Sequence, residues 1–181
     1  MQDLEKLKIV LNMEIIDLTK TLPNNGSNGY RQLKDIQYAI VHHDAVMVLG
    51  EYNAIERYVN QASYHVRNPN KFGKRFAYTY KIDVKGNVYL CSPLEQMCYH
   101  AGNFRYNKNS IGICLDGSFD KQSPSDAQLE ALEKLLDYLC TQRPDIPKLV
   151  KKTVKYHGEV RLFATVCPGK PIKDFVIKYR S

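Results

Sequence analysis

The sequence predicts an α/β domain in which helices pack on the faces of a single mixed central β-sheet. Three observations support this fold class. The apolar runs within residues 35–45 and 110–119 have the length of buried strands. Residues 75–91 alternate apolar and polar side chains on both sides of a turn, which is typical of a hairpin. Residues 123–140 carry leucines at helical spacing, and helices mixed with strands build a layered α/β domain.

The first half of the chain contains a loop, a strand and a helix. Residues 21–32 are dense in Pro, Asn, Gly and Ser, so they predict a loop. We therefore separate an N-terminal extension, residues 1–30, from one domain that covers residues 31–181. The extension is expected to add a helix or strand to the core, or to form an arm for self-association. The strand at 35–45 comes next, and residues 51–66 predict an amphipathic helix.

The second half begins with the hairpin, whose predicted turn is Lys85-Gly86-Asn87. The buried strand at 110–119 follows. In the helix at 123–140, Ser123 is the expected N-cap and a proline fits the first turn. Residues 150–157 predict a last short strand, which ends at a histidine.

Composition narrows the class of protein. The 181 residues are 44% hydrophobic and 25% charged, as in ordinary globular domains. No apolar run has the length of a membrane span, so we expect no membrane insertion. The N-terminus lacks the layout of a secretion signal, and five cysteines without such a signal argue against a disulfide framework. The net charge of +7 suits polyanionic partners such as nucleic acid or an anionic cell wall, and a basic surface that is merely solvated is the equal alternative.

Histidine and cysteine positions suggest a metal site. His42 and His157 each lie at the end of a predicted strand, and Cys167 lies in a Cys-Pro-Gly turn. Catalytic zinc typically takes three protein ligands and keeps a fourth position for water. The spacing alone is a weak signal, because it is neither a paired-cysteine nor an HExxH pattern. A second candidate cluster is close in sequence and is interpreted mainly as packing: Cys91, Cys98 and His100.

Four ordered motifs resemble one known family. IVHHDA is similar to the opening ligand motif of zinc-dependent N-acetylmuramoyl-L-alanine amidases, the group that includes phage lysozyme-amidases and peptidoglycan recognition proteins. FAYTYKIDVKGNVY resembles the family's hairpin, YHAGNFRYNKNSIGICLDG its His-Ala and Ser-Ile-Gly-Ile segment, and YHGEVRLFATVCPG its closing Thr-x-Cys-Pro-Gly motif. The similarity runs from about residue 36 to about residue 170. Four motifs in the same order are far more specific than any one of them.

The resemblance implies a role for each matching residue. Zn²⁺ would be held by His42, His157 and Cys167, and Tyr78 and Thr165 would assist catalysis by hydrogen bonding. His100 and Asn107 would contact the substrate with His43, which could instead orient the site or cap its strand. The sequence departs from the pattern at Thr79, where the family has histidine, and at Gly158, where arginine is common. Thr165 also replaces the lysine of some relatives. These departures put the proton donor in doubt rather than the metal.

Three functions remain open at this point. The resemblance implies hydrolysis of the amide bond between N-acetylmuramic acid and L-alanine in peptidoglycan, with anionic wall polymers as further partners. The lack of a signal then suits a lysin that stays in the cytoplasm until it is released to the wall, or a segment of a wall-acting protein. The first alternative is a non-catalytic peptidoglycan-recognition module on the same fold. The second is a basic nucleic-acid-binding protein, but no such motif is visible, so we expect no nucleic-acid partner.

Overall fold

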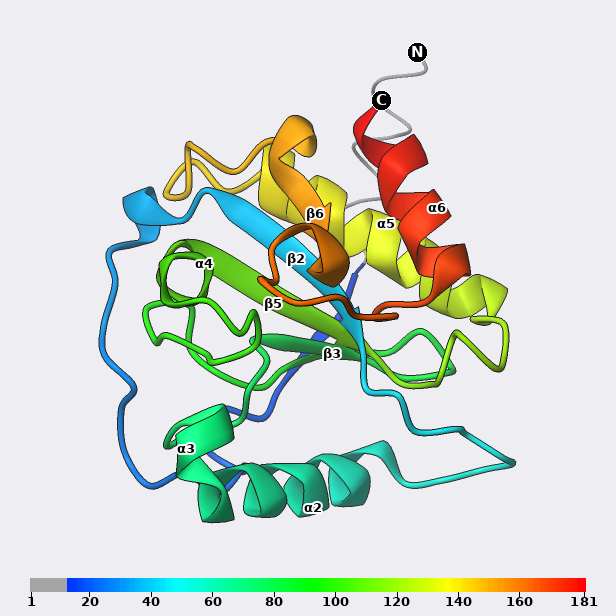
Figure 1. Ribbon diagram of the computed structural model, residues 1–181, viewed down its shortest axis with the longest axis horizontal. Coiled ribbons are helices and arrows are strands. Elements are labelled where there is room, and N and C mark those ends of the chain that lie inside the picture. The colour runs from blue at the N-terminus through cyan, green and yellow to red at the C-terminus, as the bar shows by residue number, and fades with distance from the viewer. Residues whose placement is uncertain (1–12) are drawn as a thin grey trace.

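The computed structural model describes residues 13–181, which form a six-stranded mixed sheet with helices on both faces (Figure 1). This confirms the predicted fold class. The strand order is β1-β4-β3-β5-β2-β6, and neighbouring strands are parallel except for the antiparallel β3–β4 hairpin. The strands are β1 (Ile15–Asp17), β2 (Tyr38–His43), β3 (Tyr80–Ile82), β4 (Val88–Leu90), β5 (Ser110–Leu115) and β6 (Val154–Tyr156).

Helices cover both faces of the sheet. On one face lie α5 (Asp126–Thr141) and α6 (Lys170–Arg180), and α2 (Ala54–Arg67) with the short α3 (Pro69–Phe72) lies on the other side (Figure 1). A short helix α4 (Phe104–Asn109) leads directly into β5. Three single turns of 3-10 helix occur at Leu33–Asp35, Lys151–Thr153 and His157–Glu159. Among residues 13–181, no helix is long and apolar enough to cross a membrane.

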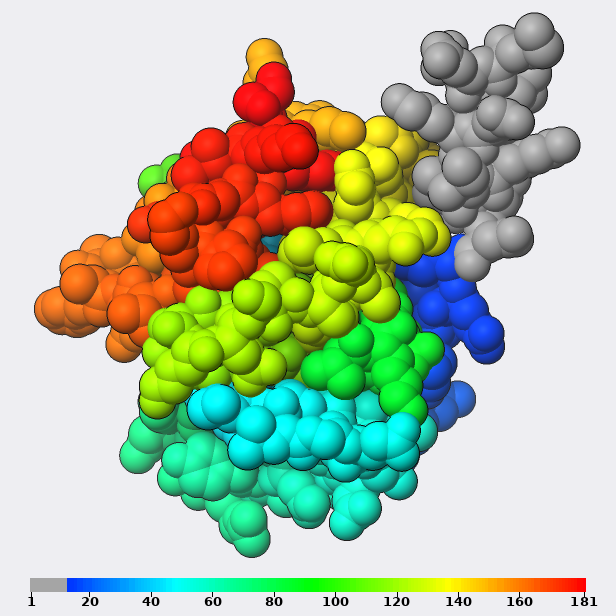
Figure 2. Space-filling view, turned by 90° about the vertical axis from the view of Figure 1, so that its right-hand side faces the viewer, coloured from blue at the N-terminus to red at the C-terminus, as the bar shows by residue number. Residues whose placement is uncertain are grey.

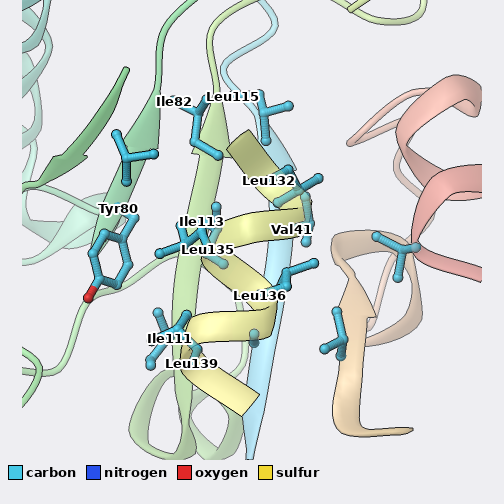
Figure 3. Close-up of a cluster of buried hydrophobic side chains, with 14 of the residues drawn as sticks. Val41, Tyr80, Ile82, Ile111, Ile113, Leu115, Leu132, Leu135, Leu136 and Leu139 are labelled. Carbon is cyan, nitrogen blue, oxygen red and sulfur yellow. The ribbon is translucent and has the colours of Figure 1, made fainter. Parts of the chain in front are cut away.

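The main core lies between the sheet and α5. The leucines predicted to line one face of this helix pack onto β2, β3 and β5, as Figure 3 shows. Strand side chains alternate between the two faces, so every second residue reaches this core. The inward-facing residues of β2, β3 and β5 are all buried: Ala39, Val41, Tyr80, Ile82, Ile111, Ile113 and Leu115.

The same alternation places polar residues on the opposite face. His42 lies beside Cys114 in the β2–β5 register, and Lys81 lies beside Cys114 in the β3–β5 register. All three side chains are buried, although they do not belong to the leucine core. One face of the sheet therefore forms the hydrophobic core with α5, while the opposite face carries the buried histidine, cysteine and lysine side chains.

Residues 15–17 of the N-terminal extension form strand β1, which pairs in parallel with β4, so the extension adds a strand to the sheet as one of the expected alternatives has it. Residues 1–12 of the extension lie outside the described residues. Other elements differ from the sequence-based prediction. The strand predicted at 150–157 is shortened to β6, because residues 151–153 form a 3-10 turn. The helices α4 and α6 were not predicted. The first is a short polar segment without a periodic pattern. The second does carry apolar residues at helical spacing, Ile172, Phe175, Val176 and Tyr179, so its signal was present in the sequence and was missed.

The N-cap of α5 is Ser125 and not Ser123, because helical geometry begins at Asp126. Ser125 Oγ accepts a hydrogen bond from the Gln128 N–H at 3.1 Å and donates one to the Val84 carbonyl at 2.7 Å. Ser125→Ala should therefore lower the free energy of unfolding by about 1–2 kcal/mol, the upper part of the range for a lost cap. Urea denaturation measures this loss. Ser123→Ala, at an exposed position, is the control, and equal losses in the two variants would contradict the assignment.

Candidate functional site

His42, His157 and Cys167 converge at one edge of the sheet. Their ligand atoms all lie within 4.8 Å of one another, and His42 Nδ1 is 3.9 Å from Cys167 Sγ. The first two meet because β2 and β6 are parallel neighbours whose carboxyl ends share this edge. His42 is the fifth residue of β2, and His157 directly follows β6. Within residues 13–181, this is the one group of three or more potential metal ligands.

The Cys-Pro-Gly turn positions Cys167 against the two histidines. The Cys167–Pro168 peptide bond is cis, and Gly169 has a φ of 84°, which only glycine adopts without strain. A Cβ atom on Gly169 would lie 2.4 Å from the Phe119 carbonyl group, so the turn packs directly against the segment after β5. The Cys167 N–H donates to Thr165 Oγ1 at 3.2 Å. The turn is therefore held on both sides of the sulfur.

The chemistry of these three groups fits a zinc ion. Two imidazoles and one thiolate are ligands that Zn²⁺ prefers, and three protein ligands leave a fourth position for water. The ring nitrogens of His157 are buried and have no hydrogen-bond partner among the described residues. Buried polar atoms are normally paired, so an unpaired ring facing two other ligands is what a metal site requires.

The acid–base properties of the ligands agree with this fit. Burial, followed by the neighbouring Arg161, lowers the pKa of His157 to about 4. Burial also lowers the pKa of His42 well below its usual value, with contributions from His157 and His100. Both imidazoles are therefore neutral near pH 7 and have a lone pair to offer. Burial raises the pKa of the Cys167 thiol to about 12, so a thiolate here needs a compensating cation.

Tyr78 and Thr165 line a hollow of about 390 Å³ that His157 and Cys167 also line. The Tyr78 ring lies 5.3 Å from the His42 ring, centre to centre. Tyr78 belongs to the irregular segment just before β3 rather than to the hairpin strand itself. The hollow also contains two cationic side chains and further aromatic rings: Lys71, Arg161, Phe72 and Tyr99.

The three residues assigned to the substrate have other contacts in the structure. Asn107 is buried, and its side-chain oxygen accepts the N–H groups of His100 and Ala101 at 3.1 and 2.8 Å. Its amide oxygen thus holds the backbone of this loop in place. His43 Nδ1 accepts the Phe119 N–H at 3.0 Å, although the residue also borders the hollow.

His100 also borders the hollow, but its ring is turned inward. Its Nδ1 lies 2.9 Å from His42 Nε2, on the side of the His42 ring away from Cys167. The second cluster considered from sequence does not assemble as a metal site, because His100 is engaged with His42. Cys91 and Cys98 are buried free thiols. The link between His100 and His42 has no signal in the sequence, because 58 residues separate the two.

A buried ionic cluster beneath the hollow was also missed. Lys81 is fully buried, and its Nζ lies 2.6 Å from Asp116 Oδ1 and 3.1 Å from Asp44 Oδ2. Arg57 from α2 contacts Asp44 at 2.8 Å, and the hydroxyls of Tyr52 and Tyr58 donate to Asp116. A lysine at an alternating strand position looks exposed from sequence alone. Asp44, which directly follows the two histidines, was the available signal.

Comparison with known proteins identifies the family. A model of the N-acetylmuramoyl-L-alanine amidase family matches residues 32–170. The chain belongs to this family. The matched region contains His42, His157 and Cys167, together with Tyr78 and Thr165.

Relatives of this amidase-family chain include recognition proteins and amidases. Peptidoglycan-recognition protein SD of Drosophila simulans is 32% identical over 117 residues, which cover 61% of this chain and 59% of that protein. The crystal structure of Drosophila peptidoglycan recognition protein SD superimposes with a TM-score of 0.76 and 21% identity, and the match covers 93% of this chain and 95% of that one. The N-acetylmuramoyl-L-alanine amidase LysC from Clostridium intestinale gives a TM-score of 0.66 and 20% identity, with 91% and 96% covered. At these identities the solved structures establish the shared fold.

Proposed function

We propose that the chain is a zinc-dependent hydrolase that cleaves the amide bond between N-acetylmuramic acid and L-alanine in bacterial peptidoglycan. The observation that carries the proposal is the complete set of two imidazoles and one thiol, whose ligand atoms lie within 4.8 Å of one another beside a hollow that His157 and Cys167 line. Membership of the amidase family supplies the reaction class. The peptidoglycan-recognition and amidase relatives support peptidoglycan as the substrate.

The residues around the cluster have distinct tasks. When Zn²⁺ is bound, it lowers the pKa of a water ligand towards neutrality and polarises the scissile carbonyl. Burial raises the pKa of Tyr78 well above 10, so its phenol keeps its proton and can donate to the carbonyl oxygen as negative charge develops there. Thr165 Oγ1 already accepts the Cys167 N–H, so its hydroxyl proton is available for the same oxygen. The proton for the leaving amine originates on the attacking water and passes through the Tyr78 hydroxyl and a relayed water, so the phenol takes up one proton as it gives one up and stays neutral.

Basic side chains give the hollow a preference for anionic substrate. Lys71 and Arg161 border it, and the chain carries a net charge of +7. Peptidoglycan stem peptides and wall polymers carry acidic groups, so these two cations favour their approach and orientation. We propose that anionic wall polymer adds to the attraction of the chain to the wall.

The second candidate is a recognition module that binds peptidoglycan without cleaving it. The peptidoglycan-recognition relatives favour this function. The retained thiol of Cys167 favours catalysis instead, because binding a wall fragment does not require a metal ligand set.

A cleavage assay separates the two functions. Purified protein is incubated with peptidoglycan, and the newly freed amino termini of L-alanine are measured with and without a chelator. We expect release that stops with the chelator and returns with added Zn²⁺. His157→Ala should abolish release, because one of three ligands is lost, while wall pelleting by the folded variant continues. Pelleting of the wild-type protein without any release would establish the recognition module and overturn the hydrolase.

A further inference from the structure

We propose that His100 and Ser110 form a hydrogen-bonded relay that fixes His42 in the tautomer whose Nδ1 lone pair faces the metal position. His100 is thus a positioning residue that acts through His42. The inference rests on the proposed zinc site for its purpose, but the relay itself is a property of the protein without metal.

The relay is a continuous chain of contacts on the polar face of the sheet. His42 Nε2 lies 2.9 Å from His100 Nδ1, and His100 Nε2 lies 3.1 Å from Ser110 Oγ. The Ser110 hydroxyl in turn donates to the carbonyl of Tyr106, in the last turn of α4. All three side chains of the relay are buried, so water does not compete for these bonds.

The carbonyl end sets the direction of the relay. A backbone carbonyl can only accept, so the Ser110 hydroxyl must use its single proton on Tyr106. Ser110 Oγ can then serve His100 only as an acceptor. The proton of the His100 ring therefore resides on Nε2.

Metal binding by His42 requires the same direction of hydrogen-bond donation along the relay. A histidine that binds a metal through Nδ1 must carry its proton on Nε2, and a partner on that proton fixes the ring orientation. His42 Nδ1 is the nitrogen that faces Cys167 Sγ, at 3.9 Å. Its Nε2–H must then donate to His100 Nδ1, which is the nitrogen left bare when His100 donates to Ser110. The Tyr106 carbonyl at one end and metal binding by His42 at the other therefore require the same proton positions along the whole relay.

The surrounding backbone is shaped to hold His100 in this position. The ring lies on Gly112, where a Cβ atom would come within 2.7 Å of His100 Cγ. Asn107 fixes the backbone of His100 and Ala101 through two hydrogen bonds. The buried guanidinium of Arg31 donates to the Ser110 carbonyl. The His100 ring therefore fits against β5 only because residue 112 is a glycine, so the backbone there is shaped to hold an imidazole ring.

Two substitutions at one position distinguish the relay from simple packing. His100→Asn keeps an acceptor near the position of Nδ1 but loses most of the ring. His100→Phe keeps a ring but removes the acceptor. We expect Zn²⁺ affinity, measured by competition with a chromophoric chelator, to fall by about 10–100-fold in the Phe variant, as for other lost partners of metal-binding histidines, and less in the Asn variant. Packing alone predicts the opposite order, so tighter binding by the Phe variant overturns the proposal.

Nuclear magnetic resonance tests the relay without any metal. In chelator-treated wild-type protein, long-range ¹⁵N–¹H correlations should show both His42 and His100 protonated at Nε2. Ser110→Ala should leave the fold intact and give His100 a mixture of tautomers. A wild-type His42 protonated at Nδ1 overturns the relay. If the tautomers are as expected but the protein binds no zinc or releases no L-alanine, the relay stands and the proposed function fails.

Discussion

Cys167→Ser should reduce Zn²⁺ affinity by more than about 100-fold, beyond the loss caused by an outer partner, and should bring L-alanine release to background. A serine hydroxyl is not deprotonated at neutral pH, so the site loses both a ligand and its negative charge. The two imidazoles cannot compensate, because each lies on a different element and already contributes its lone pair. Zinc competition and the cleavage assay measure the two effects.

Cys140→Ser is the matched control for this change. Cys140 is a partly buried thiol on α5 that packs against the leucine core, away from the cluster. We expect it to alter stability slightly and zinc affinity not at all. Retained zinc affinity in Cys167→Ser would show that the sulfur is not a ligand.

The pH dependence of zinc binding gives the same substitution a second readout. Zinc must displace the Cys167 proton, because burial raises the pKa of this thiol to about 12. Wild-type affinity should therefore rise about tenfold per pH unit between pH 6 and 8, one proton being released. The imidazoles add no slope in this range, because the pKa of His157 is about 4 and that of His42 is also depressed. In Cys167→Ser this slope should vanish.

Lys81→Met should lower the free energy of unfolding by about 3–5 kcal/mol, the cost of leaving buried charges without their partner. Lys81 lies between the carboxylates of Asp44 and Asp116, and all three side chains are buried. Removing the ammonium leaves two carboxylates facing each other, with Arg57 as the remaining cation. Denaturant unfolding at pH 7 measures the loss. Lys85→Met, on an exposed side chain of the same hairpin, should change stability little.

A second substitution and the pH dependence of stability test whether unpaired buried charge causes the loss in Lys81→Met. Asp116→Asn in the Lys81→Met background should recover part of the stability, because it removes one of the unpaired charges. Burial raises the pKa of Asp44, but Lys81 and Arg57 outweigh it and hold this pKa well below 3.8. The stability that Asp44 gains from Lys81 is therefore present above pH 3.8 and lost as the pH falls further. The difference in the free energy of unfolding between wild type and Lys81→Met should therefore become smaller in acid. A difference that does not change with pH would indicate lost packing instead.

Periodicity and turn chemistry were sufficient for much of the fold. The strands that became β2 and β5, the β3–β4 hairpin and the helix α5 were all predicted, because each has a clear apolar pattern. The cap of α5 at Ser125 instead of Ser123 did have a local signal, because Ser125 and Gln128 form a capping box three residues apart. The hydrogen bond from Ser125 to Val84, 41 positions away, has no such signal. The same holds for the pairing of β1 with β4, which joins segments far apart in the chain.

For the metal site, too, one part was predictable from the sequence and the rest was decided by the tertiary structure. The sequence by itself determined which side chains could bind a metal, because ligand chemistry belongs to the residue and the motifs keep their order along the chain. The tertiary structure alone decided that β2 and β6 are neighbours, that His100 reaches back to His42, and that Lys81 is buried between two carboxylates. The physical reason is that strand alternation selects a face for each residue, but only the packed sheet determines what that face meets.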